Sequence, residues 1–206
     1  MVNENVLSDL KYVRELAEDG AKAPLVGGRI GLMWGVLIFA IFLVQWGVLS
    51  GRLDVPASSL IYFWIGFAVV GGVGCAILGR QVSNMPGANS VANRVDATVW
   101  GMFSMMMATL FLGTFLNILL VSQSYELFSL MLPVGFAGQG LAYGLVAKFS
   151  NLKWMKLLVA ANFICSIVCF VTYGSVNIYL VGAIGIVLTV VVPSVVTMRL
   201  ESSHGA

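Results

Sequence analysis

The chain has 206 residues, of which 59% are hydrophobic and 10% are charged, and its formal net charge is +2. Soluble domains carry about 25% charged residues, and disordered chains combine low hydrophobicity with high charge. These numbers exclude both classes, and so small a net charge without a basic stripe gives no support for nucleic-acid binding. We therefore expect an all-α integral membrane protein surrounded by the lipid bilayer.

Six apolar segments are long enough to cross a membrane. A helix rises about 1.5 Å per residue, so a hydrocarbon core of about 30 Å needs about 20 residues. Turn-forming residues, such as Ser50 with Gly51 and the Met-Pro-Gly of 85–87, separate several segments. The spans predicted for this six-transmembrane-helix bundle are 30–49, 59–78, 97–121, 127–147, 152–173 and 178–198.

The distribution of basic residues predicts the orientation and the domain organisation. Eight Lys and Arg residues lie near the spans on one side, and Arg52 alone lies on the other. Since basic residues are enriched in cytoplasmic loops, we expect a chain in the cell inner (plasma) membrane with both termini in the cytoplasm. The expected parts are a cytoplasmic amphipathic helix and hinge at 1–28, a six-helix transmembrane domain at 29–199 and a short cytoplasmic tail at 200–206.

A weak internal repeat favours three helical hairpins. A tryptophan follows a basic residue near the start of the first, third and fifth spans. The pairs are Arg29 with Trp34, Arg94 with Trp100 and Lys153 with Trp154. The alternative is that Trp, Lys and Arg are enriched at membrane interfaces in any case, and both interpretations stay open at this point.

The Asp, Glu, Lys and Arg side chains lie at the ends of the predicted spans, in loops or in tails. Ionisable groups inside a membrane usually mark pumps and proton relays, so their absence from the span interiors argues against an ion-coupled transporter. His204, the single histidine, lies near the C-terminus, which excludes histidine-based haem or zinc sites within the membrane. Cys75, Cys165 and Cys169 lack the spacing of a disulfide framework or a metal site. We expect no enzymatic activity, no metal and no cofactor.

One metal hypothesis is weighed against this expectation. The methionines at 102, 105, 106 and 107 crowd the start of the third span, and thioethers with thiols suit Cu(I). Methionine is also a common apolar filler of helix contacts, and consecutive residues point around a helix instead of converging. Ordinary packing is the favoured interpretation.

The strongest polar groups inside the spans are three amides, Asn117, Gln139 and Asn162. They either line a polar path or form hydrogen bonds between helices. Gln139 lies in a stretch, 133–144, that holds one proline and four glycines. This composition predicts either a broken helix, as at the substrate sites of transporters, or close helix packing.

Small residues spaced four apart predict where helices approach closely. In a bilayer, helices have no hydrophobic drive to associate, so small side chains that let backbones meet take over that role. The glycines assigned to helix packing are Gly31, Gly35, Gly71, Gly72, Gly140 and Gly144, and a second ridge of the second span combines Gly72 with Ala68 and Ala76.

The segment 3–19 has the spacing of an amphipathic helix. Its apolar face is predicted to bind a partner through Val6, Leu10, Val13, Leu16 and Ala17. Because residues 1–19 carry two basic and five acidic side chains, attraction to anionic lipid does not hold this helix. The alternatives are burial on its own bundle, on a second copy or in a partner's groove.

These observations predict a small multi-pass inner-membrane protein that acts by interaction. It would be an accessory or scaffold subunit bound to another membrane protein, or a homo-oligomer. The alternative is a channel or facilitator for a small neutral solute through the fourth span, broken by its proline and glycines.

Overall fold

The computed structural model describes residues 11, 24–122, 126–150 and 152–204, and the side chains of all of these except 122 and 202–204. The described residues form helices and connecting turns and no strand, which confirms the all-α prediction. The longer helices are α2 (Gly28–Leu49), α3 (Leu60–Ser83), α4 (Val91–Asn117), α5 (Met131–Ser150), α6 (Met155–Val171), α7 (Asn177–Ile186) and α8 (Val192–His204). Short 3-10 or π turns adjoin them at η1 (Ala57–Ser59), η2 (Ile118–Ser122), η3 (Glu126–Leu130) and η4 (Val187–Val191).

Within the described ranges, five continuous helical runs are long and apolar enough to cross a membrane. They are Gly28–Leu49, Ala57–Ser83, Val91–Val121, Glu126–Ser150 and Asn177–Glu201. The fifth predicted span, 152–173, corresponds to α6, which is apolar but only 17 residues long. At about 1.5 Å per residue, α6 measures about 25 Å.

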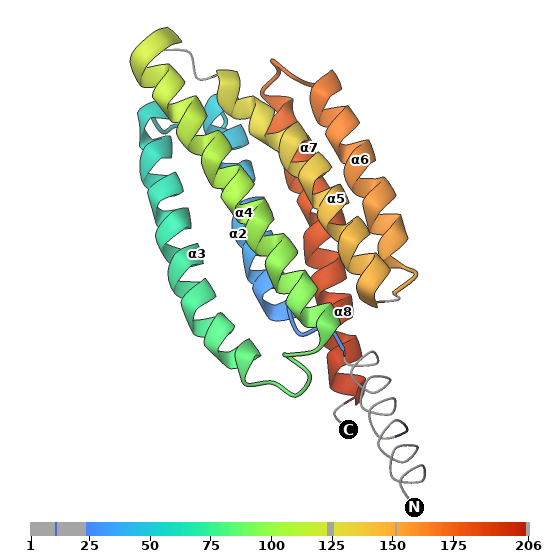
Figure 1. The fold of residues 1–206 in the computed structure, drawn as a ribbon. Coiled ribbons are helices and arrows are strands. Elements are labelled where there is room, and N and C mark those ends of the chain that lie inside the picture. The colour runs from blue at the N-terminus through green and yellow to red at the C-terminus, as the bar shows by residue number, and fades with distance from the viewer. Residues whose placement is uncertain (1–10, 12–23, 123–125, 151, 205–206) are drawn as a thin grey trace, which may run out of the picture.

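The helices form an elongated bundle in which successive helical runs lie antiparallel, with α7, η4 and α8 forming one run (Figure 1). Helix α5 lies between α4 and α6 and contacts both of them. Helix α2 contacts α3 on one side and α7, η4 and α8 on the other, whereas α3 packs chiefly on α2. The main core cluster lies where α5, α6 and the α7–η4 run meet: Leu132, Phe136, Cys169, Ile178, Tyr179, Ile186 and Val190.

Three glycines on one face of α2 bring the C-terminal helix into backbone contact. A Cβ atom on Gly28 would lie 3.0 Å from the Ser194 carbonyl oxygen, and one on Gly31 would lie 2.5 Å from the Ser194 hydroxyl. On Gly35 it would lie 2.9 Å from a methyl group of Val191. Side chains at these positions would force α2 apart from η4 and α8, so Gly31 and Gly35 lie where α2 packs against the C-terminal run.

Tryptophans join α3 to α2. Trp64 Nε1 donates a hydrogen bond to Gln45 Oε1 at 3.0 Å, and Trp34 Nε1 donates to Cys75 Sγ at 3.3 Å. The Phe67 ring lies between the two indoles, with centroid distances of 5.4 Å to Trp34 and 5.3 Å to Trp64. These side chains hold one face of α3 against α2 along much of its length.

The C-terminal run changes its winding just before its proline. Residues Val187–Val191 form a π turn, and Pro193 follows within the next turn. A proline inside a helix lacks an N–H donor and its ring collides with the carbonyl four residues earlier. A wider turn relieves that collision, which keeps Asn177–Glu201 one continuous run.

Two predicted turns are confirmed by left-handed glycines. Gly51, with φ of 72°, ends α2, and its N–H donates to the Val48 carbonyl at 3.1 Å. Gly87, with φ of 77°, lies in the connection between α3 and α4. Residues with side chains rarely adopt this conformation, so both positions favour glycine.

Replacing Gly35 by Ala is expected to destabilise the bundle by about 1–3 kcal/mol, the usual cost of adding a methyl group to a tight contact. Thermal unfolding in mild detergent, followed by circular dichroism, measures the effect. Gly101→Ala is the matched control, because Gly101 is also a helical glycine, on α4, and a Cβ there meets nothing within 4 Å. An equal loss of stability in both variants would contradict the packing role of Gly35.

Candidate functional site

The first predicted interaction site falls outside the described residues. Val6, Leu10, Val13, Leu16 and Ala17 all belong to the part of the chain that is not described. Their assignment as a partner-binding face therefore stays a prediction from the sequence.

A second candidate surface lies on α3. We call it the α3 flank and define it by Ala68, Gly72 and Ala76 together with Val69 and Val73 beside them. All five residues are exposed, and a Cβ on Gly72 would meet nothing within 4 Å. The three small residues lie four apart, so they share one side of the helix. The structure thus corrects the assignment of Gly72, which packs against no described helix.

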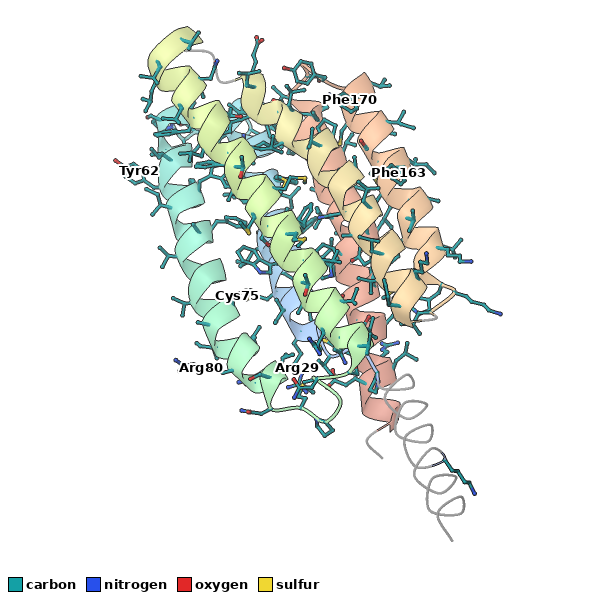
Figure 2. All side chains as sticks on the ribbon, viewed as in Figure 1. Arg29, Tyr62, Cys75, Arg80, Phe163 and Phe170 are labelled. Atoms are coloured by element: carbon teal, nitrogen blue, oxygen red, sulfur yellow. The ribbon has the colours of Figure 1, made fainter. Side chains whose placement is uncertain are left out.

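Most side chains of α3 are exposed, and the same is true of α4. Only 6% of the apolar window of Ala57–Ser83 is buried, and the value for Val91–Val121 is also 6%. The corresponding share of Glu126–Ser150 is 50%. Figure 2 shows Tyr62, near the start of α3, pointing away from the bundle, and this side chain is 74% exposed. Helices α3 and α4 therefore offer most of their surface to the surroundings.

The other predicted packing glycines do meet neighbouring helices. The Trp34 ring fills the space where a side chain on Gly71 would stand. A Cβ on Gly140 would lie 3.2 Å from the Phe163 ring, which belongs to α6. The contact of Gly144 is looser, at 3.8 Å from a methyl group of Val159.

The structure brings two of the three predicted path amides into the buried region of α5 and α6. Gln139 and Asn162 are both buried, and Asn162 Nδ2 donates to the Leu158 carbonyl at 2.8 Å. Within the described part of the chain, Gln139 Oε1 and Asn162 Oδ1 have no hydrogen-bond partner.

Asn117 lies elsewhere. Gly138, next to Gln139, approaches Met106 and Phe103 of α4. Gln139 therefore lies at about the same height in the bundle as Met106. Asn117 is eleven residues beyond Met106, which is about 16 Å along the helix axis. The three amides therefore do not form one cluster.

The fourth predicted span is not broken. Helix α5 continues from Met131 to Ser150 through all four glycines of the 133–144 stretch. Pro133 lies in the first turn of this helix, where its missing N–H costs little, and its carbonyl accepts a hydrogen bond of 2.8 Å from Ser166. The glycines serve close packing instead, since Phe103 and Met106 approach Gly138 while Phe136 approaches Gly185.

Asn93 anchors the chain that leads into α2, and sequence reasoning missed it. Its Oδ1 accepts from the Val26 N–H at 3.0 Å, and its Nδ2 donates to the carbonyls of Pro24 and Gly87 at 2.9 Å each. The Ser90 hydroxyl, which caps α4, accepts from the Asn93 N–H at 3.3 Å. This buried amide thus joins three separate segments at one end of the bundle.

Asp96 lies one turn further along α4, beside the start of α2. Its Oδ1 accepts from Trp100 Nε1 at 3.0 Å, and its Oδ2 lies 2.8 Å from where a Cβ on Gly27 would stand. The ring centroids of Trp100 and Tyr143 are 5.1 Å apart. The spacing of Asn93, Asp96 and Trp100 places these residues on one helix face, which could have indicated the contact from the sequence. From the sequence, Asp96 was placed only at the end of a predicted span.

No group of three His, Cys, Asp or Glu side chains within the described ranges is arranged to hold a metal ion. Met106 and Met107 approach α5 from α4, whereas Cys165 approaches Gly185 on the other side of α5. The thioethers and thiols of the copper hypothesis are therefore not brought together.

No family model, curated protein sequence or solved structure matches this chain. The fold and its long apolar runs define the class as an all-helical protein of the membrane type.

Replacing Asn93 by Ala is expected to lower the free energy of unfolding by about 1–3 kcal/mol, because the buried Val26 N–H and two carbonyls lose their partner. Thermal unfolding in detergent measures the loss. Asn89→Ala is the control, since Asn89 is an exposed residue of the same connection. Equal stability of the two variants would show that Asn93 does not anchor the chain.

Proposed function

We propose that this protein acts by interaction within the inner membrane, as an accessory or scaffold subunit or as a homo-oligomer. The observation that carries the proposal is the α3 flank, a row of small residues on a helix that is bound to its own bundle on one face only. The alternative, a channel or facilitator for a small neutral solute, depended on a break in the fourth span, and α5 is continuous there. Interaction is therefore the function that the geometry supports best.

The composition of the α3 flank suits contact with another transmembrane helix. Small residues four apart let two backbones approach, which strengthens van der Waals contact in a solvent as apolar as the side chains themselves. Val69 and Val73 have restricted χ1 rotamers, so ordering them in a contact costs little side-chain entropy. The tryptophan contacts on the adjoining side of α3 hold the helix in place and present the flank as a preformed surface.

The predicted face of Val6, Leu10, Val13, Leu16 and Ala17 is retained as a second proposed contact on the cytoplasmic side. Its apolar spacing and its net negative charge favour a protein partner over a lipid surface.

Gly72→Leu is expected to weaken assembly about tenfold, which corresponds to about 1.4 kcal/mol, because the new side chain stands where a second backbone would approach. Self-association is measured by energy transfer between labelled copies in liposomes, and hetero-association by cross-linking in native membranes.

The control for this experiment is Gly101→Leu. Gly101 is also exposed with nothing within 4 Å of a Cβ, and it lies on α4 and therefore outside the α3 flank. Assembly that responds equally to both substitutions, or to neither, would refute the α3 flank as the contact surface.

We further propose six spans, arranged as three hairpins, with both termini in the cytoplasm. Helix α6 runs antiparallel beside α5 along its length (Figure 1), which supports a crossing despite its 17 residues. Seven basic residues lie at the end of the bundle where α2 begins, and Arg52 lies at the opposite end. This asymmetry supports a cytoplasmic location for the basic end.

Cysteine labelling in right-side-out membrane vesicles tests this topology. Asp54→Cys, between α2 and α3, and Ser175→Cys, between α6 and α7, are expected to react with an impermeant maleimide. Asn84→Cys, between α3 and α4, is expected to react only after permeabilisation. All three positions are exposed. Protection of Ser175→Cys together with reaction of Asp54→Cys would show that α6 does not cross.

A further inference from the structure

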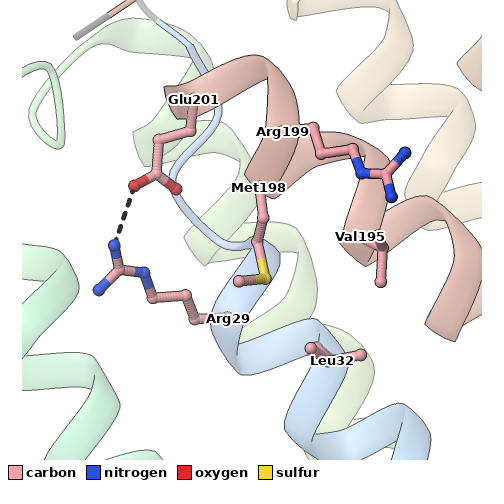
Figure 3. A pocket seen from close by; sticks show the side chains of 6 residues that line it. All are labelled: Arg29, Leu32, Val195, Met198, Arg199 and Glu201. Carbon is pink, nitrogen blue, oxygen red and sulfur yellow. Dashed lines mark hydrogen bonds and ion pairs between the residues drawn. The ribbon is translucent and has the colours of Figure 1, made fainter. Parts of the chain in front are cut away.

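A pocket of about 340 Å³ lies between the first turns of α2 and the last turns of α8 (Figure 3). Its lining combines apolar and charged side chains in equal number. The six residues are Leu32, Val195, Met198, Arg29, Arg199 and Glu201.

The pocket carries one net positive charge. Arg29 Nη2 lies 3.4 Å from Glu201 Oε1, so these two charges offset each other. Arg199 makes no ion pair with any residue that the structure describes. Figure 3 shows the two arginines on either side of Met198, with the guanidinium of Arg199 turned away from the ion pair. An anionic group in this pocket would meet an arginine that has no counter-charge.

The pocket continues into an apolar surface along the membrane-spanning part of the same helices. Val36 follows Leu32 by one turn of α2 and is 50% exposed, and Val192 precedes Val195 by about one turn and is 49% exposed. The charged residues thus lie where the two spans end, and the apolar residues extend from them toward the middle of the bundle.

We propose that this pocket binds an anionic phospholipid. Arg199 donates charge-assisted hydrogen bonds to the phosphodiester oxygens, and Arg29, on the other side of Met198, offsets the charge of Glu201 that would otherwise repel the lipid. The first part of an acyl chain follows Leu32 and Val36 on α2 and Val195 on α8. Basic pockets between the ends of transmembrane helices suit such headgroups.

The apolar half of the lining favours a lipid over free phosphate. Inorganic phosphate would engage Arg199 but would make no contact with the apolar side chains of Leu32 and Val195. A phospholipid matches both halves, because its charge and its hydrocarbon lie in the same order as the residues of the pocket. The inference does not depend on the α3 flank, which lies on another helix.

The test measures binding of phosphatidylglycerol to the purified full-length protein in a neutral detergent by native mass spectrometry. Phosphatidylcholine of the same chain length is the reference lipid. Arg199→Gln is expected to weaken phosphatidylglycerol binding about fivefold, the contribution of one arginine near a membrane surface. Arg199 is exposed and makes no ion pair among the described residues, so this substitution leaves folding intact.

The matched control is Arg80→Gln, which removes the same charge from the same end of the bundle (Figure 2) but outside the pocket. Its effect is expected to be less than about twofold. Arg29→Gln is a second test variant and is expected to weaken binding like Arg199→Gln.

Three results would overturn the proposal: equal binding of the two lipids, equal losses for the Arg80 and Arg199 variants, or displacement of phosphatidylglycerol by millimolar inorganic phosphate. The last result would assign the arginines to free phosphate instead of a lipid.

Discussion

The close approach of α2 and α8 is the constraint on which the rest of the bundle depends. Gly28 and Gly31 let the backbone of α2 come within contact distance of Ser194, so the first described span of the chain is packed against the last. With α7, η4 and α8 on one side of α2, its remaining contact face is taken by α3. Helix α3 therefore has one large partner, and its outer face is left to lipid or to another protein.

The two ends of the bundle are built differently. At the basic end, Asn93 gathers the segment before α2, the connection after α3 and the start of α4, and Arg29 pairs with Glu201. At the opposite end, Trp46 Nε1 donates to Asn177 Oδ1 at 3.3 Å between α2 and α7. These polar contacts lie near the ends of the apolar runs, where water and headgroups lower the cost of their polar atoms.

The sequence alone predicted the membrane class, the all-α fold and the approximate positions of the five long apolar runs, because length and hydropathy decide these directly. It did not tell which way each glycine faces. Gly71 and Gly72 are neighbours about 100° apart on α3, yet Trp34 covers the first and no described residue covers the second. Only the position of α2 in the fold makes one of the two glycines buried and the other exposed.

Asn93 was missed for a similar reason, since its partner Val26 is 67 residues away in the chain. Of the two interpretations of the 133–144 stretch, the broken helix is not seen, because Pro133 falls in the first turn of α5, where a proline is tolerated.

The α3 flank and the arginine pocket show how one bundle can present two chemically distinct surfaces. Shape alone distinguishes the flank from ordinary lipid-facing surface: Leu or Phe at Ala68, Gly72 and Ala76 would keep it apolar but would keep a second helix at a distance. Charge distinguishes the pocket, because its apolar floor resembles the neighbouring lipid-facing surface until Arg29 and Arg199 are added. The flank lies within a span, where no water competes for contacts, and the pocket lies at the end of two spans, where headgroups reside. Each surface therefore offers the kind of recognition that its depth in the membrane permits.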